Sequence, residues 1–159
     1  MKWLIFLNLL FLSNLALSQD LLGERIRKID THKKSVFMDR GIFHNGAIKT
    51  NSQIKAIRHS LNKEGKDTFE RLVVDFTSAK VPRIYGHLSA TEKKMFIDFF
   101  DTDVDPKIAS FGKSKYVQNI NFFPMSKELL SVEISFKNKV TTDIFYLESP
   151  GRLVIDVKE

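Results

Sequence analysis

From Gln53 to its last residue, the chain consists of strand-length runs in which apolar and polar residues alternate. This period of two is typical of β-strands that pack one face on a core. The segments between the runs are mostly short and polar or Gly/Pro-containing, as hairpin turns are. Eight runs are predicted strands: 53–61, 69–78, 82–90, 93–100, 116–125, 129–137, 140–149 and 151–159. The pattern predicts an all-β sandwich or barrel.

Triplets with an acidic residue between two apolar ones recur at a fixed spacing. Val74-Asp75-Phe76 and Val132-Glu133-Ile134 start 58 positions apart, and so do Ile97-Asp98-Phe99 and Ile155-Asp156-Val157. A shared offset and a matching strand order predict two copies of a four-strand unit. The alternative is chance recurrence of a common triplet in a β-rich chain. The repeat favours a sandwich of two pseudo-symmetric four-stranded sheets.

Two of the predicted strands, 69–78 and 151–159, share a mixed outer face. Alternation places most of their aliphatic and aromatic residues on the core side: Leu72, Val74, Phe76, Leu153, Ile155 and Val157. The opposite face holds Arg71 and Arg152, each near a valine and a carboxylate. A carboxylate in mid-strand is unfavourable on a buried face, so this face is expected to meet water, a partner or an oppositely charged strand.

The first 18 residues have the features of a secretory signal peptide. Lys2 gives a positive start, residues 3–12 form an apolar run, and Ala16-Leu17-Ser18 supplies the small residues of a cleavage site. An uncleaved anchor is the alternative, but a spanning helix needs about 20 apolar residues. We expect cleavage after Ser18 and a periplasmic product without an integral membrane span.

The rest of the composition restricts the class of protein. A chain of 159 residues has room for one domain, and it contains no cysteine for disulfides or lipidation. The formal net charge of +6 favours anionic partners, which outside the cytoplasm are cell wall, lipid head groups and envelope proteins rather than nucleic acid. Residues 19–52 form a basic leader, with a short helix and a small hairpin near Asp39-Arg40-Gly41, or with a partly flexible chain as an equal alternative.

The doubled strand pattern and the closing phrase Pro-Gly-Arg-Leu-Val-Ile-Asp-Val at 150–157 resemble the AMIN domain. This resemblance covers residues 53–159. It implies a β-sandwich that binds peptidoglycan, or that positions a parent protein at the division site or pilus machine. AMIN domains usually precede an amidase or the secretin module of a type IV pilus, and neither follows here, so the implied role is binding.

No arrangement of residues in the sequence indicates catalysis. The histidines His32, His44, His59 and His87 show no metalloprotease-type spacing, and no nucleophile-elbow motif is present. Asp101, Asp103 and Asp105 suggest calcium weakly, because the glycine and distal glutamate of an EF-hand are missing. We therefore expect no enzyme, no metal and no cofactor.

For a wall ligand, the useful groups are exposed aromatic rings, hydrogen-bonding amides and cations that meet carboxylates. The candidate ligand-binding residues are Arg71, Arg83, Tyr85, Asn119, Asn121 and Arg152. Each has the alternative of being an ordinary solvated or edge-protecting residue. The expected partner is peptidoglycan or a wall-associated complex. The alternative function is a protein–protein adaptor of a pilus or secretin assembly, with the final strand as an open edge.

Overall fold

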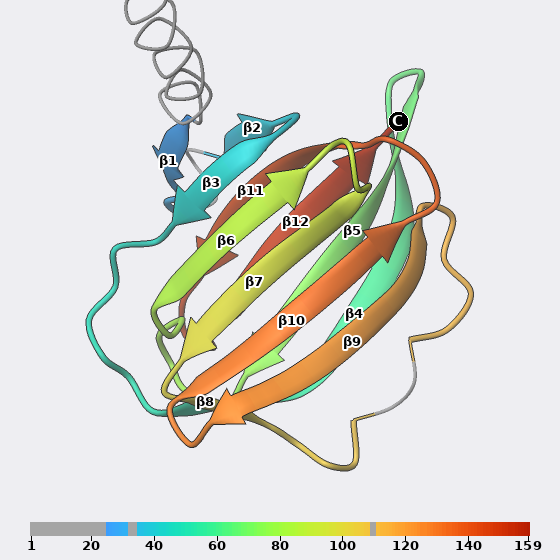
Figure 1. The fold of residues 1–159 in the computed structure, drawn as a ribbon. Helices are drawn as coiled ribbons and strands as arrows, with labels where there is room; N and C mark the ends of the chain where they lie inside the picture. Colours follow the sequence, from blue (N-terminus) through green and yellow to red (C-terminus); the bar gives the residue numbers. More distant parts are fainter. Residues whose placement is uncertain (1–24, 32–34, 109–110) are drawn as a thin grey trace, which may run out of the picture.

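The structure, a computed structural model, describes residues 25–31, 35–108 and 111–159, and these form β-strands joined by turns and loops (Figure 1). The predicted all-β class is confirmed. The eight predicted strands are β4 (Ser52–Glu64), β5 (Asp67–Phe76), β6 (Ile84–Ser89), β7 (Lys94–Phe100), β9 (Val117–Ser126), β10 (Leu129–Phe136), β11 (Thr141–Leu147) and β12 (Arg152–Lys158). The predicted signal peptide lies outside the described residues. Within them, no helix is long and apolar enough to cross a membrane.

Four short strands enlarge both sheets: two flank the turn where a small hairpin was predicted, and the other two were not predicted. They are β1 (Ile26–Lys28), β2 (Val36–Met38), β3 (Gly41–His44) and β8 (Thr102–Val104). Sheet A has the order β1-β3-β6-β7-β10-β9, and sheet B has the order β2-β11-β12-β5-β4-β8. Both sheets are mixed, because β1 pairs with β3 and β8 pairs with β4 in parallel. Each sheet therefore has six strands instead of the expected four.

The eight predicted strands enter the sheets as hairpins exchanged between the two halves of the chain (Figure 1). Sheet A takes β6–β7 from the first half and β9–β10 from the second, while sheet B takes β4–β5 and β11–β12. The last strand, β12, is consequently bonded to β11 on one side and to β5 on the other. The prediction that the final strand is an open edge is wrong, because a strand with two neighbours has no unpaired backbone edge.

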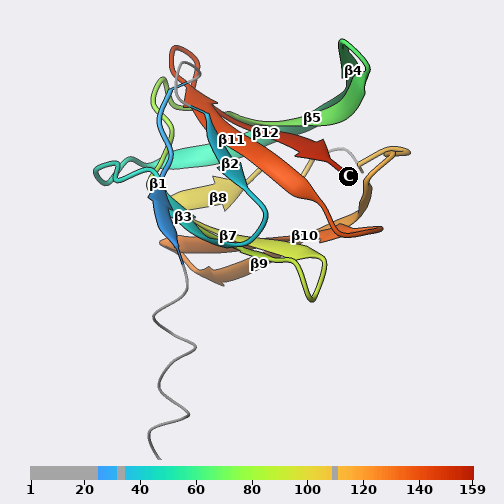
Figure 2. The same ribbon diagram turned by 90° about the horizontal axis from the view of Figure 1, so that it is seen from above.

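The two sheets form two layers with one apolar core between them (Figure 2). Alternation sends the apolar residues of each strand to the inner face, where rings from the two sheets meet. Phe76 of sheet B and Phe99 of sheet A are fully buried, and their ring centroids are 5.6 Å apart. Removing such side chains from water is the main stabilising contribution, about 1.5–3 kcal/mol for each large residue.

The described part of the leader is built into this core. Ile29, Met38 and Phe43 are at most 1% exposed. The chain turns at Asp39 and Arg40, but the expected hairpin does not form, because β2 joins β11 in sheet B and β3 joins β6 in sheet A. Part of the region expected to form a leader helix, Ile26–Lys28, is strand β1. The leader thus closes one side of the two layers.

Phe43 depends on a glycine in the neighbouring strand. A Cβ atom at Gly86 would lie 2.2 Å from Cζ of the Phe43 ring, far inside van der Waals contact. We expect Gly86→Ala to lower the free energy of unfolding by about 1–3 kcal/mol through overpacking. Urea unfolding measures this, and Gly112→Ala is the control, because its new Cβ would be 3.8 Å from the nearest atom. An equal, small effect of both substitutions would contradict the assigned contact.

Candidate functional site

The outer face of sheet A contains a pocket beside the end of β3 and the start of β6. Its volume is about 390 Å³, and its walls are His44, Gly46, Arg83, Ile84, Tyr85 and Phe100. His44 and Tyr85 are register partners on β3 and β6. The segments on either side are tied by Asn45, whose buried side chain donates to Pro82 O at 2.7 Å and accepts from Ile84 N at 3.0 Å. This tie fixes the frame of the pocket.

Two of the predicted binding residues, Arg83 and Tyr85, meet in this pocket. The Arg83 guanidinium stacks on the Phe100 ring, with Cζ 4.3 Å from the ring centroid. In the described part of the chain it has no carboxylate partner. Tyr85 is 43% exposed, so its ring is open to a ligand. A cation in one wall together with an exposed aromatic ring suits a ligand with both a carboxylate and a sugar-like or apolar surface.

A second cation lies next to the pocket. Lys28 on β1 is the register partner of His44, and its Nζ lies 3.6 Å from the position that a Cβ at Gly46 would take. Gly46 has a φ of 64°, a conformation that glycine adopts without strain. Lys28 and Arg83 therefore place two cationic side chains at the pocket, one beside it and one in its wall.

Asn119 and Asn121 lie on the same outer face but further along it, on edge strand β9. Asn119 donates to Oδ1 of Asn121 at 2.9 Å, and Asn121 donates to Oε1 of Glu133 at 3.3 Å. Lys94 bonds the other oxygen of Glu133 at 3.0 Å and gives the largest contribution to lowering the pKa of that carboxyl. Because the two amides already bond within this network, they contribute less to a ligand than Tyr85 and Arg83 do.

Arg71 and Arg152 lie on the opposite side of the molecule, on the outer face of sheet B. Arg71 donates from Nε and Nη2 to the two carboxylate oxygens of Asp156, both at 2.7 Å. Arg152 is opposite Asp75 in the ladder, but Asp75 is bonded at 2.6 and 2.9 Å by Arg58. The Nε atom of Arg152 is buried without a hydrogen-bond partner among the described residues. The six predicted residues thus occupy two opposite faces and do not form one site.

The sheet B face also contains an open groove of about 730 Å³. Its floor includes Phe69 and Phe145, and the Arg71 guanidinium lies 5.5 and 5.6 Å from their ring centroids. Lys158 and Asp143 form a longer ion pair of 3.7 Å at its side. The charges of this groove are largely matched by one another, so it offers less net attraction to an anion than the pocket of sheet A.

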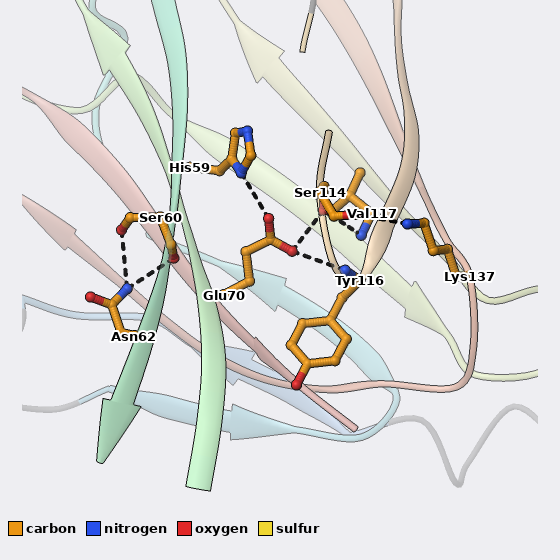
Figure 3. A network of polar contacts seen from close by, with 8 residues as sticks. All are labelled: His59, Ser60, Asn62, Glu70, Ser114, Tyr116, Val117 and Lys137. Atoms are coloured by element: carbon orange, nitrogen blue, oxygen red, sulfur yellow. Dashed lines mark hydrogen bonds and ion pairs between the residues drawn. The ribbon is translucent and has the colours of Figure 1, made fainter. Parts of the chain in front are cut away.

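Between the sheets, a buried carboxylate brings together residue types that also occur in hydrolases (Figure 3). Glu70 is 2% exposed and accepts from Ser114 Oγ at 2.6 Å and from Tyr116 N at 2.9 Å, and its other oxygen bonds His59 Nδ1 at 2.8 Å. Ser114 and His59 both bond the glutamate and not each other, whereas a catalytic triad requires a bond between serine and histidine. Ser114 also accepts from Val117 N at 2.8 Å. The cluster therefore anchors the connection before β9.

Among the residues that the structure describes, no group of three or more His, Asp or Glu side chains is arranged to hold a metal ion. Asp101, one of the carboxylates that weakly suggest calcium, forms an ion pair with Lys49 at 2.9 Å.

Sequence reasoning missed His44 and Phe100 as walls of the pocket. Phe100 could have been found, because it alternates with Phe96 and Asp98 on the face of its strand opposite Ile97 and Phe99. His44 had no such signal, since β3 has four residues in a leader without a clear period.

Comparison of the chain with models of known protein families, with curated proteins and with solved structures finds no match in any of the three. The resemblance to the AMIN domain, and the fold symmetry and function that it implies, therefore remain predictions.

Proposed function

We propose that this protein is a non-catalytic binding module of the bacterial cell envelope, that its ligand is peptidoglycan, and that the pocket around Arg83 and Tyr85 is the binding site. The observation that carries the proposal is the Arg83 guanidinium, which has no carboxylate partner among the described residues and lies over the Phe100 ring beside an exposed tyrosine. Peptidoglycan offers the matching groups, since its sugar rings stack on aromatic side chains and its peptide carboxylates attract cations.

The proposal includes three further features: periplasmic location after removal of residues 1–18, descent of the two hairpin pairs from a duplicated four-strand unit, and a sandwich of AMIN type. The exchanged hairpin order supports the second feature, because each sheet repeats the same arrangement with the two halves interchanged. The signal-like composition of the first residues supports the first.

Mature protein mixed with isolated cell-wall sacculi tests this function. Arg83→Glu and Tyr85→Ala are each expected to weaken sedimentation with sacculi about tenfold or more. The first removes a charge-assisted contact, which contributes about 1.5–3 kcal/mol, and the second removes the ring on which a sugar stacks. Arg40→Glu is the matched charge-reversal control, since Arg40 is an exposed turn residue away from the pocket. The readout is the bound fraction against sacculus concentration.

Two results would count against the proposal. Wild-type protein that stays in the supernatant at all sacculus concentrations would exclude wall binding. Variants at Arg83 and Tyr85 that sediment as strongly as Arg40→Glu would exclude the pocket as the site.

The alternative function is an adaptor in a pilus or secretin assembly. The observation that favours it is the long open edge of sheet A at β9, which is independent of the pocket.

A further inference from the structure

The four outer strands of the two sheets differ greatly in length. β1, β2 and β8 have three residues each, whereas β9 has ten. Soluble proteins usually protect sheet edges by short strands, charged side chains, prolines or bulges, because an open edge pairs with other chains. Three of the four edge strands, β1, β2 and β8, follow this rule because they are short. β9 does not.

β9 has few protective features. None of its ten side chains, VQNINFFPMS, is charged. Pro124 and one register shift protect its last residues, and a second register shift lies near Val117. The stretch from Gln118 to Phe123 between them is unprotected, and the Phe123 ring on its outer face is 46% exposed.

The hydrogen-bond pattern shows which amides of β9 face the open edge. Phe136 N donates to Lys93 O at 2.8 Å, so these two residues form a hydrogen-bonded pair at the end of the ladder between β10 and β7. The adjacent pair, Ser135 and Lys94, is then a non-hydrogen-bonded pair, because the two kinds alternate along an antiparallel ladder, and its backbone N–H and C=O groups point away from each other. The backbone groups of Ser135 therefore point toward β9, where its partner is Asn119.

Alternate residues of β9 consequently point in opposite directions. The amides of Asn119 and Asn121 point toward β10, and those of Ile120 and Phe122 point toward the open edge. In the described part of the chain, these two edge amides have no hydrogen-bond partner. Pro124 follows Phe122 by two residues, so its backbone nitrogen also faces the open edge. Its missing N–H therefore leaves no hydrogen bond to β10 unmade, which explains why a proline fits in this strand.

Charge at the start of β9 indicates what kind of strand fits there. Lys113, Lys115 and Lys137 are exposed around this end, with Lys137 N bonded to Tyr116 O at 2.9 Å. No carboxylate of the described residues pairs with these three lysines. An antiparallel partner would place its carboxyl-terminal end beside them.

We infer that β9 receives an extended segment of a partner protein by β-strand addition, and that this segment has an uncharged, β-branched centre followed by acidic residues at its carboxyl-terminal end. The centre pairs with the Ile120 and Phe122 amides and packs beside Phe123, and the acidic residues meet the lysines. A second copy fits less well, because antiparallel pairing of β9 with itself brings Lys127 toward Lys115.

Synthetic peptides of about a dozen residues, the length that covers the strand, test this inference by NMR with the mature protein. The first peptide alternates threonine with valine or isoleucine and ends in three glutamates. It is expected to bind, and to slow hydrogen exchange of the Ile120 and Phe122 amides but not that of Asn121. A peptide ending in three lysines is expected to bind about tenfold more weakly, a difference of about 1.4 kcal/mol.

Backbone chemistry and charge are then varied separately. N-methylation of the amides on one edge of the peptide abolishes binding, whereas methylation of the other edge leaves it intact, because only one edge faces β9. In Lys113→Glu/Lys115→Glu, the preference between acidic and basic peptides reverses. The pocket at Arg83 is not involved, so sacculus binding by the same double variant stays at the wild-type level.

The inference fails if no peptide binds, if both methylated peptides bind equally, or if the edge amides stay unprotected at saturation. It also fails if these amides become protected with rising protein concentration alone, which would identify the occupant as a second copy.

Discussion

Glu70→Gln is expected to lower the free energy of unfolding at pH 7 by about 2–4 kcal/mol, because hydrogen bonds to a charged group contribute more than neutral ones. The carboxylate is 2% exposed and accepts from Ser114, the Tyr116 backbone and His59. An amide in its place keeps one accepting oxygen but turns an N–H group toward donors. The connection from β8 to β9 would lose its anchor.

The dependence of the free energy of unfolding on pH, at acidic pH values, tests the same residue. Burial raises the pKa of Glu70, but the hydrogen bonds from Ser114, Tyr116 and His59 outweigh it, so the pKa lies below its ordinary value. A depressed folded-state pKa stabilises the protein above the unfolded-state value, and this contribution is lost as pH falls through the folded-state pKa. Wild-type stability should therefore decrease below the ordinary glutamate pKa, and that of Glu70→Gln should decrease less steeply.

Urea unfolding at several pH values measures both effects. Glu92→Gln is the matched control, since Glu92 is an exposed turn residue and its substitution is expected to change stability by less than about 0.5 kcal/mol. Equal pH profiles for wild type and Glu70→Gln, or an effect at pH 7 as small as that of the control, would mean that Glu70 does not anchor the connection.

The sequence allowed the eight longer strands to be predicted, because each alternates apolar and polar residues over at least six positions between recognisable turns. β1, β2, β3 and β8 have three or four residues, which is too short for a period to appear. Their pairing also depends on contacts that local sequence does not encode. β8, for example, pairs in parallel with β4, which precedes it by some 50 residues.

The candidate site was predictable residue by residue but not as an arrangement. Alternation correctly placed Arg71 and Arg152 on an outer face, but gave no indication that Arg83 and Tyr85 lie on another. It did not show that these faces belong to opposite sheets, since sheet membership follows from hairpin exchange. Glu70 was a missed signal, because it alternates with Leu72 and Val74 and so lies on the core side, where a carboxylate needs partners.

The second large effect is expected at Arg71, one of the residues that the sequence predicts to bind a ligand. Arg71→Met should lower the free energy of unfolding by about 2–3 kcal/mol. This is less than the loss of about 3–5 kcal/mol that follows when a fully buried ion pair is broken, because the Arg71 side chain is partly exposed. The reason is Asp156, which is 7% exposed and would lose both bonds of 2.7 Å. Charge reversal would add a second carboxylate and act on folding before binding.

A double-mutant cycle separates the ion pair from the packing of the Arg71 stem. Arg71→Met/Asp156→Leu should recover much of the stability lost in Arg71→Met, because replacing both charges by apolar groups leaves no unpaired buried carboxylate. Lys158→Met is the control: its ion pair with Asp143 is longer, at 3.7 Å, and both side chains are more than a quarter exposed, so a change of less than about 1 kcal/mol is expected. If Arg71→Met costs no more than Lys158→Met, or if the double variant is less stable than Arg71→Met, the pair does not stabilise sheet B, and Arg71 would again qualify as a ligand-binding residue.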